Sequence, residues 1–467
     1  MTKGDASRYF RRKEPLHGSL LSWGAVKHVH EYFQNTTCKR GGKEIFSTMM
    51  RRFFAGILAC LMVLGLAACG QAQGETSDSG ENGSEKVVNV FTKKREWNWD
   101  RIKEAFEASH PGYVLNVDIT ESTDYYNLLK TYASTGDLPD VIQTMPGSTI
   151  DLWKEYLVDI SDLECFDKMD PEITDEYYVD GTYYGVPLFA EYHGVIYNMT
   201  YLEQVGFNDV PKTIDEFVEL NEALIAAGLP TGISPWKGAE AIIAHMTAPV
   251  FGAKDDSLGY YQDIQSGAVD LMNDKDWGMF LDYIDAVRQY GNADALNTDN
   301  TTERNAMYAG EYAWYGHDGS WVTPALRATN PEMEQNLRLG VYPYSSDPDE
   351  NRIGVSTQSL SIMNTENVEA AKVFVDWLLG SDEGTDILVK DCNAVVLRTD
   401  YEMSADDVGA LAIQGRELSA NGFGANNFRN MPDSVVFNCA DSIQKYIAQV
   451  IDRDEFLNEV VKNIQNG

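Results

Sequence analysis

The chain has 467 residues, enough for two domains, and its charge is strongly negative. Lys and Arg number 37 and Asp and Glu 72, a formal charge of −35 at pH 7. The first 68 residues hold 11 of the basic and only 4 of the acidic side chains, so the remaining residues carry a formal charge of −42. Such a surface repels nucleic acids and anionic lipid headgroups, which argues against DNA or RNA binding.

Residues 49–68 have the composition of an export signal. Two arginines start it, an apolar run from 53 to 66 follows, and small residues lead to Cys69. The apolar run is short of the roughly 20 residues that a membrane-spanning helix needs. The ending LAACG resembles the lipobox of bacterial lipoproteins, in which the cysteine after the cut carries the lipid. We therefore predict a signal peptide at 49–68 and an extracytoplasmic protein that is attached to the cell membrane through a lipid on Cys69.

The segments on either side of this signal are not expected to fold. Residues 1–48 are basic and lack sustained periodicity, and a signal needs its charges at the start, so we predict a start at Met49 or Met50 and a non-native upstream extension at 1–48. Residues 69–86 contain no large apolar side chain and are rich in Gly, Ser, Glu and Gln. They predict a flexible, lipid-anchored tether.

Three further cysteines, Cys165, Cys392 and Cys439, follow Cys69 in the mature chain. There is no CxxC pair and no Cys/His spacing typical of zinc, so neither a metal site nor a cofactor is expected. The three thiols allow at most one disulfide within a monomer, and small buried packing residues are the alternative. The sequence leaves both open.

The folded part begins with alternating strands and helices. Strands are predicted at 87–91, 113–119 and 141–144, and amphipathic helices at 99–109 and 124–133. This βαβ order predicts a parallel sheet. Ligands of open α/β sheets bind beyond the carboxyl ends of the strands, which places residues 94–99 and 143–148 at one rim.

The stretch from Asp180 to Asn198 has an uncommon pattern. Two glycines bracket a hairpin-like Tyr-Tyr pair, and two short strands, 186–188 and 195–197, flank the insert 189–194. The insert carries an acid, a phenol and an imidazole, and we interpret it as a crossover at a binding site. An ordinary polar turn is the alternative.

The second half of the chain is rich in helix signals. Thr213 is expected to cap a helix at 214–227, with Glu216 at the capping-box position. Further helices are predicted at 239–251, 277–290 and 302–309, a short strand at 312–315, a Gly-Ser-Trp turn at 319–321 and a polar, aromatic loop at 421–432.

Five segments carry a resemblance to a known family. They are GDLPDVI at 136–142, DGTYYGVP at 180–187, VIYNMTYLEQVGFNDVPKTIDEF at 195–217, AMYAGEYAWYGHDGSW at 306–321 and VEAAKVFVDWLLGSDEGTDIL at 368–388. Their order and spacing resemble those of the family 1 extracellular solute-binding proteins, the maltose-binding-protein-like receptors of sugar ABC importers. The likeness covers nearly all of the chain after the tether.

The resemblance implies an α/β, two-lobed periplasmic-binding-protein-like fold. Each lobe would be a mixed, mostly parallel sheet flanked by helices, with a ligand cleft between the lobes that closes by hinge bending. We expect lobe 1 at 87–190 plus 354–400 and lobe 2 at 191–353 plus 401–467. The implied function is that of a monomer that captures a carbohydrate, an oligosaccharide above all, and delivers it to the permease of an ABC importer.

A sugar receptor needs flat aromatic platforms and planar polar groups that pair with hydroxyls. Trp321 is the first candidate platform, with a core tryptophan as the alternative. Glu191 is the first candidate acceptor, because it stands at the same distance before a Tyr-Asn pair as a cleft carboxylate of the maltodextrin receptors. A hinge salt bridge is its alternative. The other candidate ligand-binding residues are Trp236, Tyr192, Gln143, Trp97, His193, Asp318 and Arg429.

The sequence favours binding over catalysis. It contains no G-x-S-x-G elbow, no HExxH and no phosphate-binding G-x-x-x-x-G-K-[ST]. A secreted glycoside hydrolase stays open as the enzyme hypothesis, because so many acids allow a carboxylate pair. Within binding, a receptor for a polyamine or a peptide is the alternative. Thr144–Gly147 replace the aromatic and the acid that maltose receptors have there, so maltose itself is not favoured.

Overall fold

The computed structural model describes residues 85–120 and 125–467. The predicted upstream extension, the signal peptide, Cys69 and nearly all of the predicted tether lie outside the described residues. Along the part of the chain that is described, no helix is both long and apolar enough to span a membrane.

The predicted alternation of strands and helices at the start of the fold is confirmed, and the later half is mostly helical. The strands are β1 (Lys86–Thr92), β2 (Tyr113–Ile119), β3 (Val141–Thr144), β4 (Tyr178–Val179), β5 (Thr182–Tyr183), β6 (Val186–Asn198), β7 (Gly232–Ile233), β8 (Trp314–Gly319), β9 (Leu337–Gly340), β10 (Ile353–Ile362) and β11 (Gly424–Asn426). The helices are α3 (Trp99–Ser109), α4 (Tyr125–Thr135), α5 (Ser148–Trp153), α6 (Pro171–Thr174), α7 (Met199–Leu202), α8 (Ile214–Ala226), α9 (Ala239–Met246), α10 (Ser257–Ser266), α11 (Lys275–Tyr290), α12 (Asn300–Ala309), α13 (Thr323–Thr329), α14 (Pro331–Glu334), α15 (Val368–Gly380), α16 (Asp382–Lys390), α17 (Ala405–Val408), α18 (Ala410–Leu418), α19 (Asp433–Ile447) and α20 (Arg453–Asn466).

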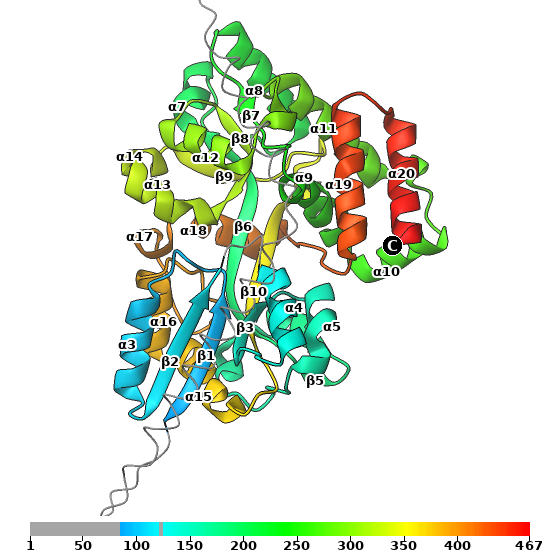
Figure 1. Ribbon diagram of the computed structural model, residues 1–467. Helices are drawn as coiled ribbons and strands as arrows, with labels where there is room; N and C mark the ends of the chain where they lie inside the picture. Colours follow the sequence, from blue (N-terminus) through cyan, green and yellow to red (C-terminus); the bar gives the residue numbers. More distant parts are fainter. Residues whose placement is uncertain (1–84, 121–124) are drawn as a thin grey trace, which may run out of the picture. The chain divides into compact units, whose positions relative to one another are not determined.

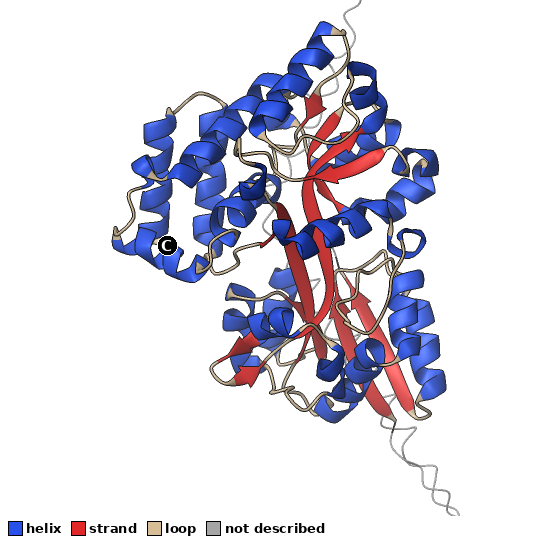
Figure 2. Cartoon of the chain, turned by 180° about the vertical axis from the view of Figure 1, so that it is seen from behind, coloured by secondary structure: helices blue, strands red, loops and turns tan. Residues whose placement is uncertain are grey.

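One mixed sheet runs through both lobes in the order β2-β1-β3-β10-β6-β8-β7, with β11 beside β10 and β9 beside β6. The pairs of β1 with β2 and β3 are parallel, as the βαβ pattern predicted. The central pair, β6 with β10, is antiparallel. These two strands pass from the lobe that holds β1, β2 and β3 into the lobe that holds β7, β8 and β9 (Figure 1), and helices lie outside the strands of both lobes (Figure 2).

The prediction of two short strands around the insert 189–194 is wrong, because β6 is one continuous strand of 13 residues. The polar residues of the insert stay in the strand because they find partners on neighbouring elements. Glu191 pairs with a lysine, and His193 shares a hydrogen bond with Tyr342. Gly194 lets β9 approach closely, since a Cβ there would lie 2.2 Å from the carbonyl oxygen of Gly340.

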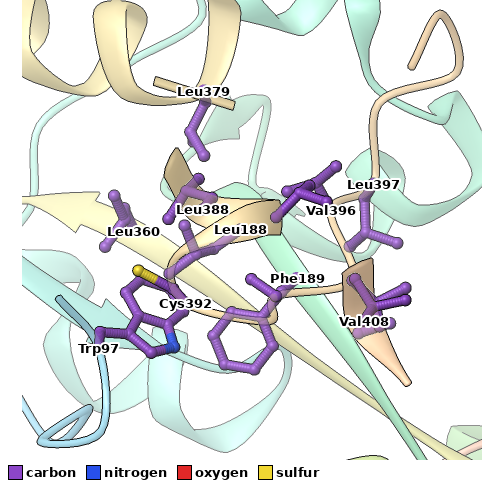
Figure 3. Close-up of a cluster of buried hydrophobic side chains, with 14 of the residues drawn as sticks. Trp97, Leu188, Phe189, Leu360, Leu379, Leu388, Cys392, Val396, Leu397 and Val408 are labelled. Carbon is purple, nitrogen blue, oxygen red and sulfur yellow. The ribbon is translucent and has the colours of Figure 1, made fainter. Parts of the chain in front are cut away.

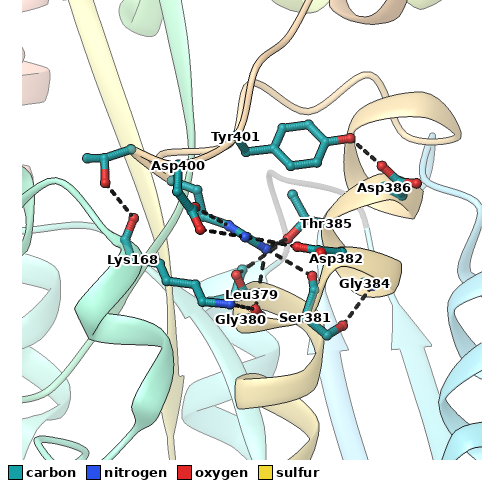
Figure 4. Close-up of polar contacts among 12 residues, drawn as sticks. Lys168, Leu379, Gly380, Ser381, Asp382, Gly384, Thr385, Asp386, Asp400 and Tyr401 are labelled. Atoms are coloured by element: carbon teal, nitrogen blue, oxygen red, sulfur yellow. Dashed lines mark hydrogen bonds and ion pairs between the residues drawn. The ribbon is translucent and has the colours of Figure 1, made fainter.

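The segment after α16 is held by a buried arginine, whose network Figure 4 draws. Arg398 is 5% exposed, and its Nε and Nη2 donate to the two oxygens of Asp400 at 2.8 and 2.9 Å. Its Nη1 donates to Ser381 O and Thr385 Oγ1, at 3.1 and 2.8 Å. Such a bidentate guanidinium has few other orientations open to it. The network therefore fixes the C-terminal end of segment 392–400. Cys392, at the other end of this segment, lines a pocket.

The three cysteines that follow Cys69 in the sequence are free and buried. Burial raises the pKa of the Cys392 and Cys439 thiols to about 12, and it also raises that of Cys165. Of the two possibilities that the sequence left open, the structure therefore has the packing residues and not a disulfide.

The predicted strand at 312–315 is displaced, because β8 begins at Trp314 and runs to Gly319. Trp314 is fully buried and donates from Nε1 to Asn221 Oδ1 of α8 at 2.8 Å. Its ring covers Gly232 of β7, where a Cβ would lie 2.0 Å from ring carbons. A side chain at position 232 would therefore collide with the indole.

Gly232→Ala is expected to destabilise the fold, because the buried indole has no space to give way. Overpacking of this kind costs about 1–3 kcal/mol. The matched control is Gly278→Ala in α11, where nothing lies within 4 Å of the added Cβ and the helix should gain up to about 1 kcal/mol. Urea unfolding of the three proteins measures both effects. Equal stabilities of the two variants would contradict the assignment.

Candidate functional site

A small pocket of about 30 Å³ opens where β6, the turn after β8 and the loop after β1 meet. Cys392 and Trp97 line it and also belong to a cluster of buried hydrophobic side chains (Figure 3). The lining residues come from both predicted lobes. They are Lys94, Glu96, Trp97, Phe189, Ala190, Glu191, Ser320, Trp321, Pro324, Cys392, Asn393, Ala394, Val395 and Ala412.

The charged centre of the pocket is Lys94, which bridges two carboxylates. Its Nζ lies 2.8 Å from Glu191 Oε1 and 3.3 Å from Glu96 Oε1. The ammonium also lies 4.4 Å from the ring centroid of Phe189, a cation–π distance. Burial alone would lower the pKa of Lys94, but Glu191 and Glu96 hold it above its usual value. The pocket therefore contains a stable positive charge between two acids.

The aromatic wall of the pocket is Trp321, whose indole is held on two sides. Its Nε1 donates to Asp318 Oδ1 at 2.8 Å. Its six-membered ring lies over Gly319, where a Cβ would come within 2.7 Å of it. The rings of His193 and His317 are 6.0 and 6.2 Å away, centroid to centroid. Trp321 stays partly exposed, so one part of the indole is open to the pocket.

Of the nine sequence candidates, Trp321, Glu191 and Trp97 line this pocket. Trp97 is 6% exposed and meets Phe189 edge to face at 5.4 Å. Asp318 does not line the pocket, but it accepts a hydrogen bond from the indole of Trp321. Lys94 was not among the candidates, although the sequence had placed residues 94–99 at this rim. Its partner Glu191 is 97 positions away, and no local signal joins the two.

The other five candidates do not line this pocket, and their contact with a ligand stays a prediction. Tyr192 is buried against α18, where a Cβ on Gly415 would lie 2.3 Å from its Cβ. Gln143 is buried, and its Oε1 accepts from Thr92 Oγ1 and Lys93 N at 2.8 and 2.9 Å.

Trp236, His193 and Arg429 complete the five. Trp236 is 1% exposed, and its Nε1 finds no partner among the described residues. His193 is 2% exposed, with Nδ1 at 2.7 Å from Tyr342 OH. Arg429 donates from Nη2 to Ser356 Oγ of β10 at 3.0 Å.

Metal chemistry has no support in the described part of the chain, where no group of three or more His, Cys, Asp or Glu side chains is arranged to hold an ion. The pocket can instead offer an aromatic face, one ammonium and two carboxylates to a ligand. Such a set can stack on a sugar ring and exchange hydrogen bonds with its hydroxyls.

The sequence of the chain matches a known protein family and several relatives. The family model described as bacterial extracellular solute-binding protein matches residues 101–408. A relative named "Multiple sugar-binding protein" from Streptococcus mutans is 26% identical over 337 residues, which cover 69% of this chain and 77% of that protein. A putative binding protein from Brucella abortus is 24% identical over 354 residues, covering 72% and 79%.

Solved structures share the fold. The raffinose complex of the binding protein RafE superposes with a TM-score of 0.69 at 18% identity, covering 81% of this chain and 99% of that one. A chitin oligosaccharide binding protein gives 0.68 at 19% identity, covering 82% and 99%. These similarities confirm the two-lobed α/β fold that the sequence predicted.

Proposed function

The chain belongs to the bacterial extracellular solute-binding proteins, and on that basis we propose that it is the receptor of an ABC importer for a carbohydrate, an oligosaccharide above all. The observation that carries the proposal is the pocket in which the partly exposed indole of Trp321 lies with the ion-paired Glu191 and Lys94. The relative named for multiple sugars and the neighbour with bound raffinose support a sugar as the ligand class.

The family places the protein outside the cytoplasm. We further propose that a lipid on Cys69 anchors it to the cell membrane, and that it acts as a monomer that delivers its ligand to separate permease subunits. Neither a cofactor nor a catalytic step belongs to this function. A glycoside hydrolase would release product from a bound sugar, so the binding experiment below also tests for it.

Capture requires opening of the lobes. The pocket of about 30 Å³ holds one or two water molecules, far less than a sugar ring. We propose that β6 and β10, which pass between the lobes, carry the hinge, with lobe 1 at 87–190 plus 354–400 and lobe 2 at 191–353 plus 401–467. A ligand that bridges Lys94 and Trp321 would stabilise the closed form by its higher affinity for that form.

The charge pattern favours a neutral ligand over a polyamine. A polyamine receptor would need carboxylates without a cation of their own. Here Glu191 and Glu96 both contact the ammonium of Lys94, at 2.8 and 3.3 Å. A polyamine would therefore have to compete with a lysine that is only 12% exposed.

Calorimetric titration of the purified protein with raffinose, stachyose, maltose and chitin oligosaccharides tests the proposal, with spermidine as the polyamine arm. We expect at least one oligosaccharide to bind and spermidine to give no heat. Binding of spermidine with no response to any saccharide would overturn the sugar assignment. Chromatography of the same samples checks for hydrolysed product, whose appearance would revive the enzyme hypothesis.

A double-mutant cycle decides whether Glu191 contacts the ligand or serves the hinge. If Glu191 accepts hydrogen bonds from sugar hydroxyls, Glu191→Gln should weaken binding about tenfold, the size of one lost charge-assisted hydrogen bond. Lys94→Met and the double variant complete the cycle. If Glu191 acts only through Lys94, the double variant binds no worse than Lys94→Met. Glu334→Gln, an ion-paired glutamate that does not line the pocket, is the matched control.

A further inference from the structure

We propose that Asp318 is a positioning residue, whose ionised carboxylate holds the indole of Trp321 toward the pocket, so that protonation of Asp318 releases the indole and weakens ligand binding. Only the effect on ligand binding rests on the proposed function. The effect of Asp318 on the position of the indole concerns the protein without ligand.

Asp318 forms hydrogen bonds with the aromatic wall of the pocket and with α12. Its side chain is fully buried and does not line the pocket. One oxygen, Oδ1, accepts from Trp321 Nε1 at 2.8 Å and from Arg304 Nε at 2.9 Å. The other oxygen, Oδ2, has no hydrogen-bond partner among the described residues. The carboxylate therefore links the pocket wall to a guanidinium on α12.

The indole depends on this bond because its other supports are steric. Gly319 leaves room for the ring on one side, and the imidazoles of His193 and His317 lie about 6 Å away. None of these contacts fixes rotation of the indole as a hydrogen bond from Nε1 does. An ionised acceptor makes a shorter and stronger bond than a neutral carboxylic acid.

Asp318 can change its charge near neutral pH. Burial raises the pKa of this carboxyl to about 6, even though Arg304 and the hydrogen bonds from Arg304 and Trp321 lower it in part. Glu303, on the same helix as Arg304, is fully buried too. Burial, and then the charge of Asp318, raises the pKa of Glu303 well above its usual value.

The remaining groups around Asp318 do not titrate in this range. Burial lowers the pKa of His193 to about 4 and that of His317 well below its usual value, and burial raises the pKa of Tyr308 and Tyr342. The titratable and charged groups that interact with Asp318 are Glu303, Arg304 and Tyr308 of α12 and Tyr342, while His193 of β6 and His317 of β8 lie beside the indole of Trp321. Asp318 is therefore the group among them with a pKa near 6.

The spectrum of Trp321 tests the first step without any ligand. We subtract the near-ultraviolet circular dichroism of Trp321→Phe from that of the wild type at each pH from 5 to 8. The difference is expected to change with a midpoint near 6. In Asp318→Asn, which keeps an oxygen acceptor but cannot titrate, the corresponding difference against Asp318→Asn/Trp321→Phe should be flat. Glu303→Gln should keep the midpoint. A flat wild-type curve, or a midpoint that survives in Asp318→Asn, would overturn the proposal.

The second step is measured with raffinose, stachyose, maltose and chitin oligosaccharides at pH 5, 6 and 7. For a saccharide that binds, the wild type should lose affinity below pH 6, by at most about tenfold per pH unit. Asp318→Asn should bind with an affinity that does not change over this range, and a change in it as large as that of the wild type would refute the link to binding. If no saccharide binds, the proposed function fails, but the spectra still decide the positioning role.

Discussion

Trp321→Ala is expected to weaken saccharide binding by one to two orders of magnitude and to leave the fold intact. The indole is the one large aromatic face that the turn after β8 presents to the pocket, and loss of a stacking platform costs about 1–3 kcal/mol. The substitution leaves no buried charge unpaired, since Asp318 keeps its bond to Arg304. Calorimetric titration measures the affinity, and urea unfolding checks the fold.

Two further variants make this result specific. Trp321→Phe keeps an aromatic face and should lose less affinity than the alanine variant. Tyr156→Ala removes a 41% exposed aromatic residue that does not line the pocket, and should bind like the wild type. Unchanged affinity in Trp321→Ala would remove this residue from the site, whatever the other variants do.

Glu303→Gln is expected to make the protein relatively more stable as the pH rises. The folded-state pKa of Glu303 lies well above its unfolded value, chiefly through burial and then through the charge of Asp318. Above about pH 4.5 the folded protein therefore holds a proton that the unfolded chain has released. The free energy of unfolding of the wild type therefore falls through this one group as the pH rises above about 4.5.

Glutamine cannot titrate, so the variant lacks this contribution. Its side-chain oxygen can still accept from His317 N, as Glu303 Oε1 does at 3.1 Å. The difference in unfolding free energy, variant minus wild type, should grow as the pH rises from 5, by at most about 1.4 kcal/mol per pH unit. Urea unfolding at four pH values measures it. Glu311→Gln, at an exposed residue just after the same helix, is the control variant. Parallel pH curves for Glu303→Gln and the wild type would show that Glu303 ionises normally.

Local signals predicted much of the architecture. The strands β1, β2 and β3 and the helix α3 lie where periodicity placed them. Thr213 caps α8 by accepting from Glu216 N at 3.2 Å. Such features depend on side chains within a turn or a strand of one another, so a single sequence contains them.

The position of Glu303 could not be predicted from local sequence signals. The sequence predicted a helix at 302–309, and a glutamate in the first turn of a helix would ordinarily face solvent. In the structure Glu303 is fully buried and accepts from the backbone of β8. Its position depends on how α12 packs against β8, and helical periodicity gives no information about a partner that follows a loop.

The sequence by itself determined the order of the elements, the family and the candidate residues Glu191 and Trp321, because motif spacing and strand and helix signals are local. Only the tertiary structure decided which way the side chains of β6 point. Alternation along a strand requires Glu191 and Tyr192 to face opposite ways, but it does not say which of them faces the pocket. That choice came from packing: Tyr192 lies against α18, and Glu191 meets Lys94, which is 97 residues away.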